Sequence, residues 1–136
     1  MARMESHEGG CLCRAVRYRV TGSPLYTVIC HCESCRKAAA APSMAWITFA
    51  RENFQILLGT PRGFRSSSGV LRTFCENCGS PLTYASDQRS GEIDVTTLSM
   101  DDPSLFPPTR EIWLEERITW EALNPERKQF SRGGGE

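Results

Sequence analysis

Hydrophobic and polar residues alternate along several short stretches of the chain, as they do in half-buried β-strands. In the predicted strand at residues 11–20, Val16, Tyr18 and Val20 alternate with two arginines. Stretches rich in β-branched and aromatic residues predict further strands at residues 25–30, 43–49, 54–59, 70–75, 81–85 and 91–99, with one or two short strands within residues 109–120. The pattern therefore predicts a mainly-β protein.

One segment has the composition of a helix. Residues 33–41 are rich in helix formers and Pro42 follows them, which predicts about two helical turns beginning near Ser34. Residues 100–108 contain three prolines and predict an irregular loop. The polar, glycine-rich residues 126–136 predict a frayed tail.

The bulk composition excludes several classes of protein. A chain of 136 residues, with 40% hydrophobic and 24% charged residues, predicts a single domain over residues 1–136. Sixteen basic residues balance sixteen acidic ones without a long block of either sign, so no nucleic-acid partner is expected. The sequence has neither the apolar core of a signal peptide nor an apolar run of about 20 residues, so we expect a cytoplasmic protein without a membrane partner.

Seven cysteines are the most informative residues. Their odd number, without an export signal, favours metal-bound thiolates over a disulfide framework. Cys75 and Cys78 form a C-x-x-C pair followed by Gly79, which is half of a zinc knuckle. Cys11 and Cys13 can supply the other half. The four thiolates would form a closed structural zinc site, whose binding free energy contributes to folding.

This allocation leaves Cys30, Cys32 and Cys35. Three protein ligands with a free fourth position are typical of a catalytic zinc site. Cys35 falls in the first turn of the predicted helix, where backbone N–H groups and the nearby charges of Arg36 and Lys37 favour a thiolate.

Other ligand sets remain open from the residues alone. His31 or His7 would close the second site if either were its fourth ligand. The cysteines would also be explained by one zinc ion, with the remaining thiols free or buried. An iron–sulfur cluster is disfavoured because the spacings match neither ferredoxin pattern.

The ordered motifs of the chain resemble those of the glutathione-dependent formaldehyde-activating (GFA) family. The resemblance covers residues 9–120, which we take as the core of the domain, followed by a polar tail at 124–136. It is carried by C-x-C, C-x-C-x-x-C and C-x-x-C-G motifs in order, and by the segments GGCLCRAVRYRV, CHCESCRK, SSSGVLRTFCENCGSPLTY, GEIDVTTLSMDDP and IWLEERITW.

The resemblance implies an antiparallel β-tent of packed sheets, stabilised by zinc, with one short helix after the second cysteine motif. It implies two Zn²⁺ ions per chain and a carbon–sulfur lyase activity that makes S-(hydroxymethyl)glutathione from glutathione and formaldehyde. The expected partners are a small-molecule thiol and an aldehyde. Position by position, it assigns the structural zinc to Cys11, Cys13, Cys75 and Cys78, and the second, catalytic zinc to Cys30, Cys32 and Cys35.

A tripeptide thiol has two carboxylates, so cationic and hydroxyl side chains are candidates to bind it. These are Arg36, Lys37, Arg62, Arg65, Arg72 and the serines at 66–68, with Ser67 at their centre. The alternative interpretation is that they are solvated surface groups. Trp46, Trp113 and Trp120 are predicted to pack in the core or on the sheets, with Trp46 as a candidate pocket residue.

Two departures from the family pattern point to another substrate. Residues 109–111, Thr-Arg-Glu, stand where many relatives have a histidine, and residues 38–46 are plainer than the usual small polar stretch. A second class of function therefore stays open beside the enzyme. In this alternative, both zinc ions only stabilise the fold and the surface binds a protein or glutathione.

Overall fold

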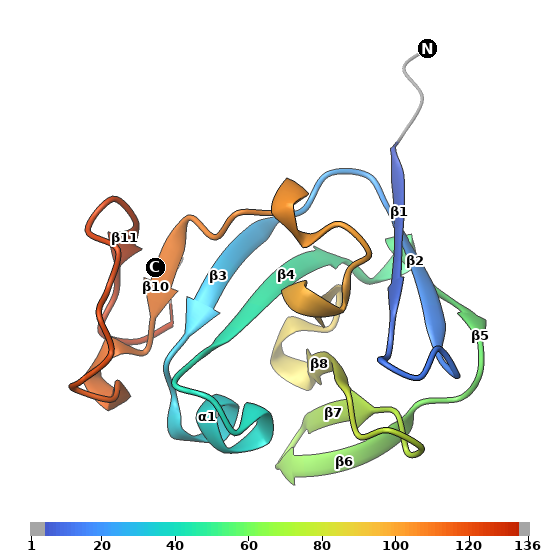
Figure 1. The fold of residues 1–136 in the computed structure, drawn as a ribbon, viewed down its shortest axis with the longest axis horizontal. Coiled ribbons are helices and arrows are strands. Elements are labelled where there is room, and N and C mark those ends of the chain that lie inside the picture. Colours follow the sequence, from blue (N-terminus) through green and yellow to red (C-terminus); the bar gives the residue numbers. More distant parts are fainter. Residues whose placement is uncertain (1–4, 134–136) are drawn as a thin grey trace.

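The computed structural model describes residues 5–133, which form two β-sheets (Figure 1). The smaller sheet is antiparallel and has the order β1-β2-β5. Its strands are β1 (Ser6–Gly10), β2 (Arg17–Thr21) and β5 (Phe54–Leu58).

The larger sheet has eight strands in the order β11-β10-β3-β4-β9-β8-β7-β6. The strands β3, β4, β9, β8, β7 and β6 pair antiparallel, whereas β10 is parallel to both β3 and β11. Their bounds are β3 (Tyr26–Cys30), β4 (Met44–Ala50), β6 (Arg62–Ser67), β7 (Val70–Phe74), β8 (Pro81–Ser86), β9 (Glu92–Thr96), β10 (Arg110–Ile112) and β11 (Lys128–Gln129).

The main core lies where the apolar faces of the two sheets meet. Tyr18 and Val20 of β2 are fully buried against Ile47 and Phe49 of β4 and Val95 of β9. The alternation read from the sequence therefore places the apolar side chains of β2 in the core and its arginines outside.

Strand β4 is buried on both faces, and this positions the second cysteine cluster. Ile47 and Phe49 face the main core, while Met44 and Trp46 pack in a separate cluster with Cys30 and Cys35. One strand thus connects the main core to the second cysteine motif.

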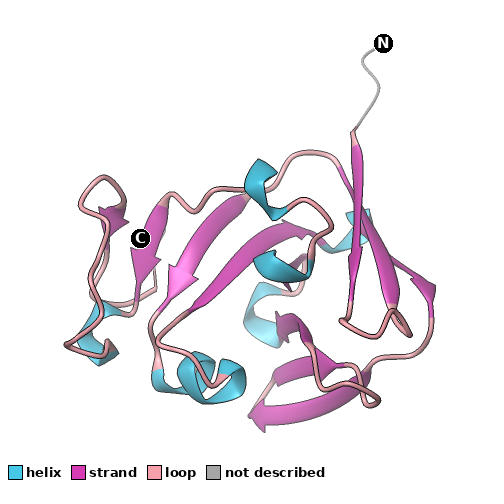
Figure 2. Cartoon of the chain, viewed as in Figure 1, coloured by secondary structure: helices cyan, strands magenta, loops and turns pink. Residues whose placement is uncertain are grey.

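Helices are few and short among residues 5–133 (Figure 2). The α-helix α1 (Glu33–Ala39) starts one residue before the predicted position and ends at Ala40, which has the left-handed conformation. None of the helices that the structure describes is long and apolar enough to cross a membrane. Five short 3₁₀ helices are η1 (Arg51–Asn53), η2 (Asp87–Arg89), η3 (Thr97–Ser99), η4 (Pro103–Leu105) and η5 (Leu114–Glu116).

The mainly-β, sheet-packed architecture predicted from the sequence is confirmed, with local corrections. Residues 11–16 form a turn in which the N–H of Cys11 donates to the carbonyl of Val16, so the predicted strand forms only from Arg17. Strands β1 and β6 were missed, because β1 ends in two glycines and all six residues of β6 are exposed.

The prediction of a frayed tail is wrong for residues 126–133. Strand β11 pairs with β10, and the N–H groups of Trp113 and Leu114 donate to the carbonyls of Arg132 and Phe130. Residues 134–136 lie outside the described part. The core-packing prediction also fails for Trp120, which is 74% exposed. It holds for Trp46, which is buried, and Trp113 packs against the same cluster.

Candidate metal centres

The first cysteine cluster joins two turns that are distant in the sequence. Cys11 and Cys13 lie on the turn between β1 and β2, and Cys75 and Cys78 on the turn between β7 and β8. All four sulfur atoms lie within 4.8 Å of one another, and the Cys11–Cys13 and Cys13–Cys75 Sγ distances are both 3.7 Å. A tetrahedral zinc with Zn–S bonds of roughly 2.3 Å places its sulfurs about 3.8 Å apart. The donor set therefore fits a zinc ion.

Hydrogen-bond donors surround the sulfurs of this first cluster. The N–H of Val16 donates to Cys11 Sγ, and the Asn77 amide donates to Cys13 Sγ, both at 3.2 Å. Hydrogen bonds from the Ser80 hydroxyl and backbone lower the pKa of the Cys78 thiol to about 5. Such donors stabilise thiolates, as a metal site of this type requires. The sequence analysis had not identified Asn77 and Ser80.

The second cluster forms where β3 passes into α1. Cys30 ends β3, Cys32 is the N-cap of α1 and Cys35 lies in its first turn, where its N–H donates to Cys32 Sγ at 3.3 Å. The three sulfurs lie within 4.8 Å of one another, packed against Met44 and Trp46. None of the seven cysteines, all of which lie within residues 5–133, is part of a disulfide.

Arg72 is the predicted substrate-binding residue that the structure brings to this cluster. Its Nη1 and Nη2 atoms lie 3.9 and 3.8 Å from Cys35 Sγ, and its guanidinium stacks over the ring of Tyr84 at 4.9 Å. The Nε–H donates to the hydroxyl of Ser66 at 3.1 Å. The side chain is therefore held beside a sulfur atom, within reach of an anionic ligand.

One sulfur of the trio is strongly favoured as a thiolate. Hydrogen bonds from Cys30 and Cys32 lower the pKa of the Cys35 thiol to about 3, and the positive charge of Arg72 acts in the same direction. The pKa of the Cys30 thiol is raised, because Cys30 gives hydrogen bonds to its two neighbours and is buried.

The other predicted substrate-binding residues do not gather at the cluster. Arg36 turns to the backbone, donating from Nε to the carbonyl of His31 at 3.3 Å and from Nη2 to that of Glu116 at 3.2 Å. The remaining candidates, Lys37, Arg62, Arg65 and Ser67, are exposed to solvent.

Neither histidine belongs to a cysteine cluster. His31 Nε2 lies 2.5 Å from Glu111 Oε1, and both side chains are fully buried. Burial alone would raise the pKa of Glu111, but hydrogen bonds from His31 and Arg127 lower it. His7 lies 3.4 Å from Glu5 and packs edge-on against Phe106. Geometry therefore does not support a histidine as the fourth ligand of the second cluster.

Glu111 is a buried site residue that the sequence analysis did not identify. No local pattern marks it, because its partner His31 is 80 positions away.

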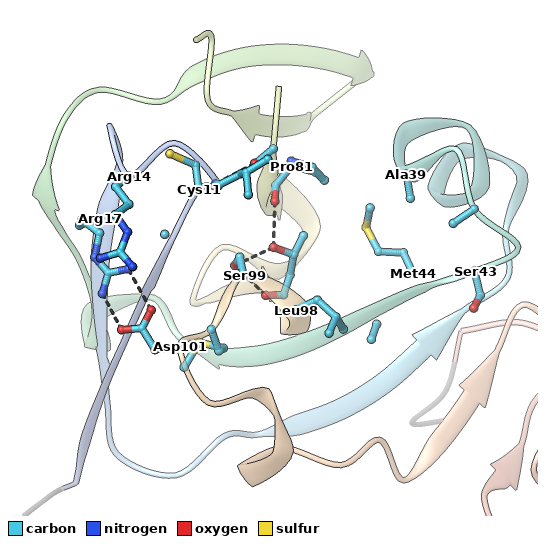
Figure 3. A pocket seen from close by; sticks show the side chains of 17 residues that line it. Cys11, Arg14, Arg17, Ala39, Ser43, Met44, Pro81, Leu98, Ser99 and Asp101 are labelled. Carbon is cyan, nitrogen blue, oxygen red and sulfur yellow. Dashed lines mark hydrogen bonds and ion pairs between the residues drawn. The ribbon is translucent and has the colours of Figure 1, made fainter. Parts of the chain in front are cut away.

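A cavity of about 600 Å³ extends from Cys11 of the first cluster to Ala39 and Met44 (Figure 3). Cys11 and Arg14 line one end, and Ala39 and Met44 line the other. Met44 also packs against Cys30 and Cys35, although the sulfurs of the second cluster do not line the cavity themselves.

The fold and these two clusters define a mainly-β protein with four-cysteine and three-cysteine sites suited to metal binding. The model of the family described as "Glutathione-dependent formaldehyde-activating enzyme" matches residues 6–116, which include all seven cysteines. The chain belongs to this family, so the resemblance read from the motifs is confirmed.

One curated relative and one solved structure are similar to this chain. A protein from Schizosaccharomyces pombe described as an uncharacterized lyase is 33% identical over 82 residues, which are 60% of this chain and 59% of that protein. The matched part thus spans less than two thirds of the relative. A crystal structure of a Rhodobacter sphaeroides protein superposes with a TM-score of 0.59 over 90% of this chain and 98% of the other, at 16% identity. At that identity the likeness shows the fold alone.

Proposed function

We propose that this chain is a zinc-dependent carbon–sulfur lyase that joins a small thiol to an aldehyde, with glutathione and formaldehyde as the reference pair. The family membership and the lyase description of the fission-yeast relative support a lyase-like function related to glutathione. The observation that carries the proposal is the trio of buried Cys30, half-buried Cys32 and buried Cys35, which offers three sulfurs to one ion.

The two clusters divide the work between folding and chemistry. The first has four sulfurs, which fill a tetrahedral ion and leave it chemically quiet, so we assign it a structural zinc. The second has three sulfurs, and no histidine or carboxylate among residues 5–133 joins them. A zinc ion held there with one position free would lower the pKa of a bound thiol, so that thiolate is present at neutral pH.

The chain's own residues then hold and orient the substrate. The three cysteines hold the metal, and Arg72 places a positive charge where an anionic sulfur or carboxylate of the thiol would lie. In the reaction, the sulfur forms a bond to the aldehyde carbon, the C=O π-bond breaks, and the thiol proton ends on the new hydroxyl group. Trp46 and Met44 limit the access of water to the buried side of the cluster.

The partners we propose are this thiol and this aldehyde, rather than nucleic acid or a membrane, and the compartment we propose is the cytoplasm.

The test compares zinc content and thiol-dependent activity in the wild type and in Cys32→Ser. We expect two zinc ions per chain in the wild type, and one zinc with little activity in the variant. A Cys32→Ser protein that kept both its second zinc and full activity would overturn the proposal. Two zinc ions in the wild type without any response to thiols or aldehydes would favour a non-catalytic zinc module instead.

A further inference from the structure

We propose that Glu111 is a positioning residue for the three-cysteine cluster, acting through His31 and supported by Arg127 and Glu116. The inference rests on the metal-binding part of the proposed function. It assigns a role to the C-terminal segment, which supplies none of the seven cysteines.

The backbone brings this segment to the cysteines. Strand β10 runs parallel to β3 with Ile112 opposite Cys30, and the N–H of His31 donates to the carbonyl of Ile112 at 3.0 Å. In Figure 1, β10 lies beside β3 and between β3 and β11. The backbone position of the last residues of β3 therefore depends on the position of β10.

A network of buried side chains holds His31, the residue between Cys30 and Cys32. His31 stands between Cys30 and Cys32, and its ring is tied by Nε2 to Glu111 Oε1. The other carboxylate oxygen of Glu111 accepts from Arg127 Nη1 at 2.9 Å. A carboxylate that is 2% exposed needs such partners, so the ring, the carboxylate and the guanidinium hold one arrangement.

A second pair of contacts fixes the start of α1. The carboxylate of Glu116 accepts from the N–H of Glu33 at 2.9 Å, and its backbone carbonyl accepts from Arg36 Nη2. Arg36 also donates to the carbonyl of His31. The turn that presents Cys32 is thus tied on both sides to residues 111–116.

Metal affinity depends on how closely the ligands are held to the geometry of the ion. Releasing His31 frees the backbone on which Cys30 and Cys32 lie, whereas Cys11, Cys13, Cys75 and Cys78 lie on other elements. Loss of Glu111 is therefore expected to weaken the second metal site selectively.

The test measures the affinity of both sites for Zn²⁺, by competition with a chromophoric chelator, in Glu111→Gln and in the wild type. We expect affinity at the second site to fall by about tenfold or more, with the first site unchanged. The thiolate-to-cobalt absorption of the second site should change with it, because the angles between the sulfurs change.

Asp94→Asn is the matched control. Asp94 is another buried carboxylate, bound by Arg89 and by the hydroxyl of Thr48, and it belongs to neither cysteine cluster. A purely structural role for Glu111 would lower the melting temperature, as in Asp94→Asn, without changing the affinity of the second site.

A folded Glu111→Gln protein with wild-type affinity at both sites would overturn the inference. If this variant does not fold, Arg127→Gln decides, because it removes the ion pair that holds the Glu111 carboxylate: a selective loss at the second site supports the inference, and unchanged affinity overturns it. A wild type that binds one ion would contradict both this inference and the proposed function, whereas two ions unaffected by these substitutions would contradict this inference alone.

Discussion

The guanidinium of Arg72 lies 3.8 Å from the sulfur of Cys35, although the two residues come from β7 and α1. Stacking on Tyr84 and a hydrogen bond to Ser66 hold the guanidinium in place. Arg72 therefore places a fixed positive charge beside the three-cysteine cluster, which we propose to be the reactive one.

Replacing Arg72 by Gln should weaken the binding of glutathione by about 10- to 150-fold, because a charge-assisted contact to the anionic ligand contributes roughly 1.5–3 kcal/mol. Zinc content should stay at the wild-type value. Isothermal titration with glutathione measures the effect. Arg19→Gln is the control, since Arg19 pairs with Glu8 on the outside of β2. Equal affinities in both variants would contradict a role for Arg72 in binding.

The first cluster should determine whether the chain folds. Cys75 is 1% exposed, and its cluster joins the β1–β2 turn to the β7–β8 turn. Cys75→Ser should therefore lower the free energy of unfolding by more than about 4 kcal/mol, as expected when a structural metal is lost. Chemical denaturation measures it. Cys32→Ser should cost far less stability; if the two variants were equally unstable, the division of roles between the clusters would be wrong.

Gly9 is required because β1 passes close to the side chain of Tyr18 and to the backbone of η3. A Cβ at this position would lie less than 3.0 Å from the hydroxyl of Tyr18 and from the backbone oxygen of Ser99. We expect Gly9→Ala to destabilise the protein by about 1–3 kcal/mol, because the buried Tyr18 ring must move. Urea unfolding measures the loss. Gly91→Ala is the control, since a Cβ there meets nothing within 4 Å, and an equal loss in both variants would refute the steric argument.

Deleting residues 126–136 should affect the second cluster although the deleted segment contains no cysteine. The truncation removes Arg127, which pairs with Glu111, and β11, which pairs with β10. We expect weaker zinc binding at the second site and a lower melting temperature, measured by chelator competition and calorimetry. A truncated protein with unchanged values would show that residues 126–136 do not support the second cluster.

The sequence predicts what is decided locally. Alternation assigns Val16, Tyr18 and Val20 to one buried face, and the spacing of the cysteines favours a four-sulfur set and a three-sulfur set over the other ligand sets that the residues leave open. The structure places the sulfurs in these same two sets. The family resemblance adds the architecture of packed sheets, which the individual strands do not specify.

What the sequence does not predict depends on distant partners. Strand β6 is an edge strand with six exposed residues, so no hydrophobic period marks it, and it forms because β7 pairs with it. Four arginines and one lysine are candidates for substrate binding from the sequence. Arg72 is the one that reaches Cys35, because of how β7 pairs in the sheet, and the sequence does not show that pairing. The buried carboxylate of Glu111 has hydrogen-bond partners, Arg127 and His31, that lie 16 and 80 positions away in the sequence.

The central claim is that the metal at the three-cysteine cluster has a position free for a thiol. The most direct test is to replace zinc by cobalt and titrate the protein with glutathione, using S-methylglutathione as a control that lacks the free thiol. The account predicts that glutathione changes the ligand-field and sulfur-to-cobalt absorption of one of two bound ions, and that the methylated peptide does not. Spectra of both ions that stay unchanged at saturating glutathione would contradict it.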